Sequence, residues 1–201
     1  MEHARMENDI ILHGRLDDRA QVSHSNHGEV FLSVPLVVCR LSGTRDRLNL
    51  LIPERLLTNR EPQPGDEVTV RGEVRSFNNR SGLGSRLVIT VLARQLIWES
   101  GEDDNRLTLA GVLCKPPVFR CTPLGRNICD LMLAVNRRYG RTDYLPCISW
   151  GTLAHRCAVL DVGDAVRLEG RLQSRTYTKN LADRCEERTA FEISVMTMEE
   201  E

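Results

Sequence analysis

Apolar and polar residues alternate along several short segments of the chain. In residues 166–173 every even position is apolar or glycine, and every odd position is polar or charged. Residues 68–75 repeat this alternation. Apolar side chains at every second position are typical of a β-strand with one buried face. The pattern therefore predicts a protein built mainly from short strands.

The two alternating segments belong to two copies of one longer pattern. The copies align at an offset of 97 residues in their first part, and at 98 after one inserted residue. Residues 89–91 match residues 193–195 at an offset of 104, which predicts a loop about six residues longer in the second copy. The matched pairs include Gly14 with Gly111, Arg40 with Arg137, Asp46 with Asp143, and Gly72 with Gly170. Such self-similarity predicts a duplicated domain.

Each copy is expected to contain five strands, with a short helix between the third and the fourth. In the first copy the expected strands are 9–16, 28–40, 46–52, 66–77 and 85–97, with a helix at 53–59. In the second copy they are 105–113, 126–138, 143–150, 164–177 and 187–198, with a helix at 151–159. This order predicts an all-β fold of two tandem OB-fold barrels, at 1–99 and 105–201, joined by a linker at 100–104. A glycine midway along each fourth strand fits a barrel wall where two backbones approach closely.

The net charge of −1 hides an uneven distribution of charged residues. Acidic clusters lie at 102–104 and 199–201, and residues 105–198 between them carry fourteen basic and nine acidic side chains, a net charge of +5. A locally basic body is compatible with nucleic acid as a partner. No apolar run approaches the roughly 20 residues of a membrane span, and the first twenty residues lack the basic-then-apolar order of a secretory signal. We therefore expect a cytoplasmic protein without a membrane partner.

The seven cysteines form no C-x-x-C pair of the kind used in zinc and redox sites. We expect most of them to be small buried residues in a reducing compartment. His24 and His27 form an H-x-x-H pair, but no further ligand lies nearby in the sequence, so we expect both to be solvated loop residues. No metal ion or other cofactor is expected.

Six of the nine aromatic residues lie in the second copy, including every tyrosine. On the expected third strand Tyr144 and Trp150 share one side, and on the fourth Tyr177 shares the outward side with Arg171 and Arg175. Rings beside arginines on an exposed face suit single-stranded nucleic acid, because unpaired bases stack on the rings and arginine neutralises the phosphates. The alternative is that Tyr144 and Trp150 pack in the barrel core.

The second copy also resembles the bacterial single-stranded DNA-binding proteins. The resemblance extends from residue 105 to residue 195 and rests on three motifs in the right order: NRLTLAG at 105–111, DYLPCISWG at 143–151 and GRLQSRTY at 170–177. It implies an OB-fold that coats single-stranded DNA with little sequence preference during replication, recombination or repair, and that catalyses no reaction.

In this family, aromatic residues stack on bases at the positions that match Tyr139, Tyr144, Trp150 and Tyr177. The strand alternation points to the last three without the resemblance, whereas Tyr139 rests mainly on it. The basic residues expected to contact the DNA are Arg137, Arg138, Arg141, Arg171, Arg175 and Lys179.

The first copy lacks all four rings at the equivalent positions, which are Ser42, Arg47, Pro53 and Asn79. We therefore expect a degenerate N-terminal OB-fold that works in assembly or scaffolding. Extension of an electrostatic track for the DNA is the alternative. Phe77, on the same side of its strand as Arg71 and Arg75, is the candidate for a stacking ring there.

Members of the family commonly present four OB barrels per assembly, which implies a homodimer for a two-barrel chain. Many members also recruit replication and repair proteins through a long acidic tail. Here residues 199–201 directly follow the last expected strand, so recruitment through such a tail is not expected.

Three other functions remain open. The chain could be an accessory factor of replication restart or a plasmid- or phage-type homologue, or an OB module that binds RNA through the same rings. It could also be a nuclease or hydrolase built on OB barrels. Against an enzyme, the sequence has no P-loop, H-E-x-x-H or G-x-S-x-G motif and no carboxylate cluster suited to two metals.

Overall fold

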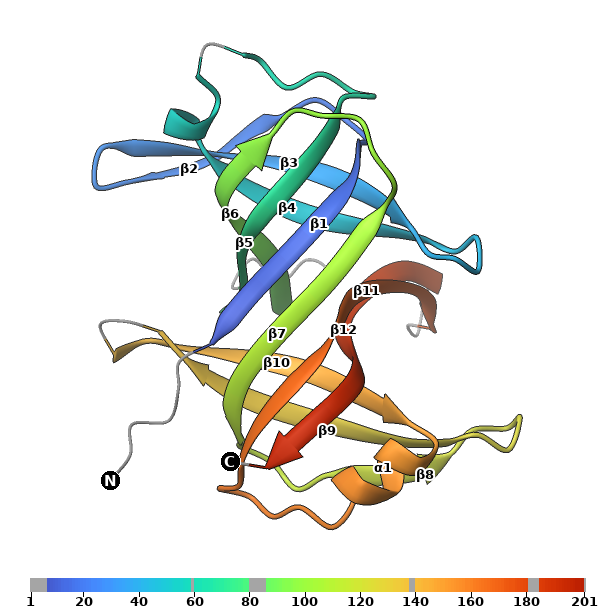
Figure 1. Cartoon of the computed structure of the whole chain (residues 1–201). Helices are drawn as coiled ribbons and strands as arrows, with labels where there is room; N and C mark the ends of the chain where they lie inside the picture. Colours follow the sequence, from blue (N-terminus) through green and yellow to red (C-terminus); the bar gives the residue numbers. More distant parts are fainter. Residues whose placement is uncertain (1–6, 59, 80–85, 138–139, 181–184, 201) are drawn as a thin grey trace. The chain divides into compact units, whose positions relative to one another are not determined.

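The computed structural model of the chain describes residues 7–58, 60–79, 86–137, 140–180 and 185–200. Most of these residues lie in β-strands, as Figure 1 shows. They divide into two compact units. The N-terminal unit contains Asp9–Arg75 and Ile89–Arg106, and the C-terminal unit contains most of the remainder, including Ser76–Val88.

The first copy of the repeat folds as a closed sheet. Its elements are β1 (Asn8–Leu16), β2 (Gln21–Asn26), β3 (Glu29–Cys39), β4 (Arg45–Pro53), the 3₁₀ turn η1 (Glu54–Leu56), β5 (Glu67–Asn78) and β6 (Leu87–Ile97). The strand order is β2-β3-β4-β6-β5-β1, and β1 also pairs with β3 to close the barrel. Alternate apolar residues of these strands, such as Leu12, Leu48 and Val70, fill the interior.

The second copy repeats this topology. Its elements are β7 (Asp104–Leu113), β8 (Val118–Cys121), β9 (Asn127–Asn136), β10 (Thr142–Trp150), α1 (Thr152–Cys157), β11 (Ala165–Asn180) and β12 (Cys185–Glu200). The order is β8-β9-β10-β12-β11-β7, and β7 closes onto β9. The prediction of two OB-fold barrels, each with a short helical turn after its third main strand, is confirmed.

Each barrel has one strand more than the sequence pattern predicted. The additional strands, β2 and β8, are short outer strands whose residues are all exposed. A strand exposed on both faces has no apolar–polar alternation, so the pattern could not show it. The two-residue turn His27-Gly28, with positive φ at both positions, joins β2 to β3 as in a type I′ hairpin.

The structure corrects the offset assigned to the last strand. The parallel pairs Leu50–Val91 and Cys147–Ile193 occupy equivalent places in the two barrels, so the last strands align at an offset of 102 rather than 104. The loop before β12 is therefore four residues longer, not six. The predicted alignment of this strand was shifted by two residues. Such a shift leaves every side chain assigned to the same face, because side chains alternate with a period of two.

Glycines on the fourth main strand of each barrel allow close backbone contact. A Cβ atom at Gly72 would lie 2.3 Å from the carbonyl oxygen of Leu92, and one at Gly170 would lie 2.2 Å from that of Ser194. These separations are far below van der Waals contact, so only glycine fits without movement of a backbone. The close approach predicted for these glycines is present.

We expect Gly170→Ala to destabilise the C-terminal barrel by about 1–3 kcal/mol, because β11 and β12 must separate to admit the methyl group. Urea denaturation followed by circular dichroism measures the loss. Thr178→Ala, an exposed substitution on the same strand, is the control and should change the stability by less than about 0.5 kcal/mol. Equal stability of the two variants would contradict the packing argument.

The cysteines are less buried than expected. Cys129, Cys147 and Cys157 are buried, Cys114 is partly buried, and Cys39, Cys121 and Cys185 are exposed. All seven are free thiols. Burial raises the pKa of the Cys129 thiol to about 11, which keeps it protonated at neutral pH.

In the described part of the chain, no helix is long and apolar enough to cross a membrane. Across the same residues, no three His, Cys, Asp or Glu side chains are grouped so that they could hold a metal ion.

Candidate nucleic-acid interface

Two large rings stand on the outer face of β10. The side chains of Leu145 and Cys147 point into the barrel and are buried, whereas Tyr144 is 50% exposed and Trp150 is 39% exposed. The alternative that these two rings belong to the core is therefore excluded. Six residues of strand separate them, a distance of about 20 Å, so each ring would contact a different base.

The backbone beside Tyr144 is held by a residue of the first copy. The Tyr144 amide donates to Oγ of Ser76 (2.8 Å), and the Ser76 amide donates to the Asp143 carboxylate (2.5 Å). Ser76 lies near the end of β5 and belongs to the C-terminal unit by its contacts. The next residue, Phe77, is 51% exposed. The first copy thus contributes a third exposed ring to this unit, which the alternation within one copy could not place.

Arg137 forms an ion pair with a buried carboxylate. Its Nε and Nη2 atoms donate to both carboxylate oxygens of Asp143, which is fully buried, and Nη2 also donates to the carbonyl of Ser76 (3.0 Å). Arg40 and Asp46 form the same bidentate pair in the first barrel (2.6 and 2.7 Å). The matched Arg and Asp positions of the repeat therefore mark a structural pair, which engages Nε and Nη2 of Arg137.

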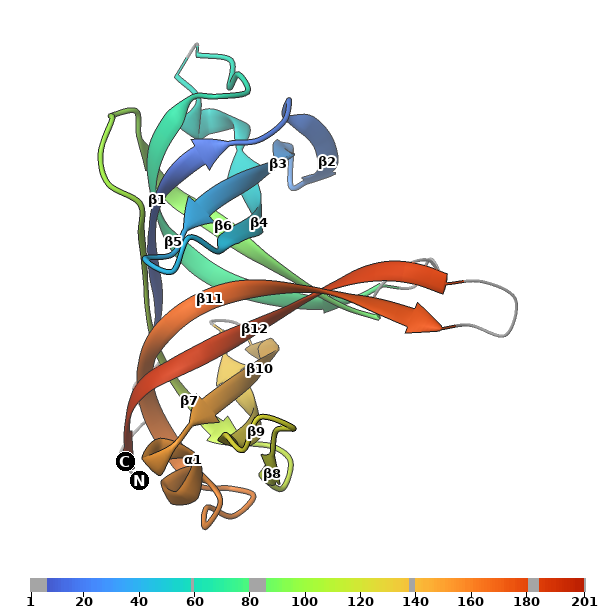
Figure 2. The same ribbon diagram turned by 90° about the vertical axis from the view of Figure 1, so that its right-hand side faces the viewer.

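Tyr177 lies on a long two-stranded arm. β11 and β12 remain paired as far as Asn180 and Cys185 and extend well away from the other strands of their barrel (Figure 2). The Tyr177 ring is partly exposed, and the guanidinium carbon of Arg175 lies 5.5 Å from its centroid. This is the distance of a cation–π contact.

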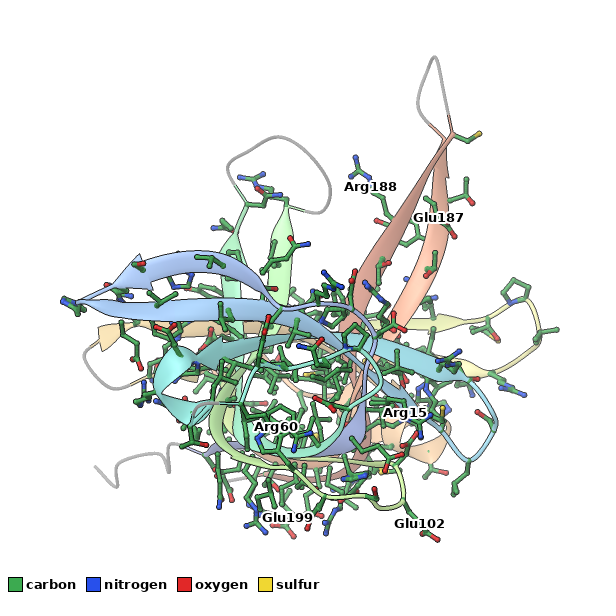
Figure 3. All side chains as sticks on the ribbon, turned by 90° about the horizontal axis from the view of Figure 1, so that it is seen from above. Arg15, Arg60, Glu102, Glu187, Arg188 and Glu199 are labelled. Atoms are coloured by element: carbon green, nitrogen blue, oxygen red, sulfur yellow. The ribbon has the colours of Figure 1, made fainter. Side chains whose placement is uncertain are left out.

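The arm also places a basic residue that sequence reasoning missed. Arg188 on β12 lies directly opposite Tyr177 in the antiparallel register. Figure 3 shows the side chains of Arg188 and Glu187 projecting to opposite sides of the arm. The position of Arg188 depends on the register of the hairpin, which the spacing of apolar residues alone does not determine.

The other fourth-strand residues expected on the outer face differ in their surroundings. Arg171 is partly buried, and its Nε has no hydrogen-bond partner among the described residues. Gln173, expected to be exposed, is buried and donates to the Glu192 carboxylate (2.8 Å). The neighbouring carboxylate of β12 makes this burial possible, because it satisfies the amide of Gln173.

Acidic side chains reduce the positive charge of this outer face. Asp130, opposite Ile148 in the sheet, accepts from Nε of Arg120 (2.6 Å). The Asp130 carboxylate raises the pKa of the Arg120 guanidinium. Part of the +5 charge counted from the sequence is therefore neutralised locally.

The remaining expected residues are placed as follows. Arg141 is exposed just before β10. Arg138 and Tyr139 lie outside the described residues, as does the side chain of Lys179.

In the first barrel, the position of Tyr144 is taken by Arg47. Its Nε donates to the Asp17 carboxylate (2.7 Å). The Arg75 guanidinium forms an ion pair with Glu73, which also accepts from Arg94 (3.0 Å). The two arginines are therefore already bound to carboxylates of their own barrel, which weakens the case for an electrostatic track built on them.

Comparison with known proteins matches the second copy of the repeat to a family profile. The profile of the single-strand binding protein family matches residues 104–200. Single-stranded DNA-binding protein A of Bacillus subtilis is 34% identical over 87 residues, which are 40% of this chain and 51% of that protein. A single-stranded DNA-binding protein of Halalkalibacterium halodurans is 33% identical over 99 residues, 46% of this chain and 56% of that protein.

The chain thus spans about half the length of the curated relatives it matches. Among solved structures, the wild-type single-stranded DNA binding protein from Thermus aquaticus superposes with a TM-score of 0.80 at 22% identity. That match covers 98% of this chain and 94% of the other. It shows a shared fold over both copies of the repeat.

Proposed function

We propose that the chain binds single-stranded DNA with little sequence preference and protects it during replication, recombination or repair. The match of residues 104–200 to the profile of the single-strand binding protein family supports this proposal. The observation that carries this proposal is the exposure of Tyr144 and Trp150 on one face of β10. Every base has a flat π surface, so stacking on these rings favours unpaired strands without selecting a sequence.

The arginines around the rings supply the second part of the proposed interface. Arg141 and Arg175 are exposed, and Arg171 has an Nε–H without a partner in the described part of the chain. This Nε atom is buried, so a nucleic-acid group could bond to it only if the Arg171 side chain moved. We propose Tyr177 and Arg188 for the same interface, because the Arg175 guanidinium lies over the Tyr177 ring and Arg188 lies opposite Tyr177 in the strand register.

The two barrels have different roles in this proposal. The C-terminal barrel carries the main stacking surface, and the N-terminal barrel, which lacks rings at the equivalent positions, works in assembly. Two copies would associate into an assembly of four barrels in the cytoplasm. Binding requires no cofactor and no catalytic step.

A fluorescence titration with oligo-dT tests the function. In a Trp98→Phe background Trp150 is the only tryptophan, and stacking on a base should quench its emission. The logarithm of the binding constant should fall linearly with the logarithm of the salt concentration, by about 0.7 per phosphate neutralised. Absence of both quenching and binding would overturn the proposed function.

Two further arms of this titration address the alternatives. Tighter binding to oligo-rU than to oligo-dT would favour an RNA-binding module. Degradation of the oligonucleotide in the presence of magnesium would favour a nuclease. An intact dT oligonucleotide bound at least as tightly as rU supports the proposal.

A further inference from the structure

The N-terminal barrel carries a stacked pair of rings on its outer hairpin. The imidazole of His24 on β2 lies parallel to the ring of Phe31 on β3, with centroids 4.8 Å apart and an angle of 5° between the planes. His24 is exposed and Phe31 is partly buried. His24 is solvated as expected, but it lies within a strand rather than in a loop, and it is held against a ring.

This pair occupies the place in the first barrel that Trp150 occupies in the second. Trp150 lies directly opposite Ile128 in the antiparallel pair of β10 and β9. The equivalent residues of the first barrel, at the offset of 97, are Pro53 and Phe31, which also lie directly opposite each other. Side chains of directly opposed residues project from the same face of a sheet.

In the two barrels the ring comes from different strands of the equivalent strand pair. In the second barrel the third main strand supplies the ring, and the aliphatic Ile128 is buried beside it. In the first barrel the second main strand supplies the ring, and Pro53 is buried beside it. The alignment of the two copies pairs Trp150 with Pro53 and so predicts no ring at this position of the first barrel. In the structure Phe31, directly opposite Pro53, places a ring at the same point on the barrel face.

A cationic group lies on the same face as these rings. Glu29 precedes Phe31 by two residues, so their side chains project from the same side of β3. Glu29 forms an ion pair with Arg55 of η1, whose side chain is about half exposed. Glu29 thus binds the Arg55 guanidinium as Asp17 binds that of Arg47, so the proposed site depends on the rings and not on this cation.

We propose that His24 and Phe31 form a base-stacking site for single-stranded nucleic acid in the N-terminal barrel, with the exposed imidazole as the contact surface and Phe31 as its support. This proposal rests on the proposed function of the chain. The tight turn at His27-Gly28 fixes the hairpin register that sets His24 on Phe31.

Photocrosslinking to an oligo-dT that carries 5-iodouracil tests the site, because this base crosslinks to rings on which it stacks. Trypsin releases residues 20–40, with His24 and Phe31, and residues 142–156, with Tyr144 and Trp150, as separate peptides. We expect crosslinks on both peptides in the full chain. Crosslinks on 142–156 without any on 20–40 would overturn this inference alone. Crosslinks on neither peptide would overturn the proposed function as well.

Variants of His24 separate stacking from a purely structural role. His24→Ala should abolish the crosslink on 20–40, retain that on 142–156, and weaken oligo-dT binding on the order of fivefold or more. His24→Tyr restores a ring and should restore the crosslink. The control is Val22→Ala, an exposed substitution on the same strand, which should leave both crosslinks unchanged. A crosslink on 20–40 that persists in His24→Ala, or is lost equally in Val22→Ala, would overturn the assignment.

Discussion

Replacing Tyr144 and Trp150 together with alanine should weaken oligo-dT binding by about 2–6 kcal/mol, because each ring is expected to contribute about 1–3 kcal/mol by stacking on a base. The lower end of this range corresponds to roughly a thirtyfold rise in Kd. Both rings are exposed and their strand neighbours fill the core, so the double variant should fold. Fluorescence anisotropy of a labelled oligonucleotide measures the affinity without requiring a tryptophan.

The matched control for this variant is the double substitution Val159→Ala and Val162→Ala. Both valines are exposed apolar residues of the same barrel, in the segment between α1 and β11. Their substitution by alanine removes apolar surface without removing a ring, so the affinity for oligo-dT should remain that of the wild type. If the ring variant binds within threefold of the wild type, Tyr144 and Trp150 do not form the interface.

Asp143→Ala should lower the free energy of unfolding of the C-terminal barrel by about 3–5 kcal/mol, the usual cost of leaving one partner of a buried ion pair alone. The carboxylate is fully buried and accepts from Arg137 at both oxygens and from the Ser76 amide. Its removal leaves three donor groups without an acceptor. Urea denaturation followed by Trp150 fluorescence in the Trp98→Phe background measures the loss.

An exposed ion pair of the same barrel provides the comparison. Arg120 and Asp130 are both partly solvated, and pairs of this kind contribute about 0–1 kcal/mol. Asp130→Ala should therefore change the unfolding midpoint much less than Asp143→Ala. Similar losses for the two variants would show that burial does not determine the strength of the Arg137 pair.

The main strands and the exposed rings could be predicted because both depend on a period of two. Alternation alone separates Leu145 from Tyr144 and Trp150, and the structure places them on opposite faces of β10. The same period hides errors of two residues, as in the offset of the last strand. The alternation also gives no signal for strands that are exposed on both faces, as in β2 and β8.

Contacts between segments that are distant in the sequence could not be predicted in this way. The charge of Arg137 predicted a DNA contact, but it could not show that the guanidinium also donates to the carbonyl of Ser76 in the first copy. Arg188 was missed because its place opposite Tyr177 depends on the hairpin register. The ring of Phe31 was missed because the alignment compares Trp150 with its equivalent position, Pro53. It does not compare Trp150 with the residue that lies across the strand from Pro53.

The shortness of the outermost strands limits how copies of this chain could join. The sheet order ends at β2, with six residues, in one barrel and at β8, with four, in the other. A second molecule extending either sheet could make only a few main-chain hydrogen bonds, because antiparallel neighbours bond at alternate residues. A stable dimer would therefore depend on apolar area covered on strand surfaces, and raising the salt concentration should release the nucleic acid before it separates the subunits.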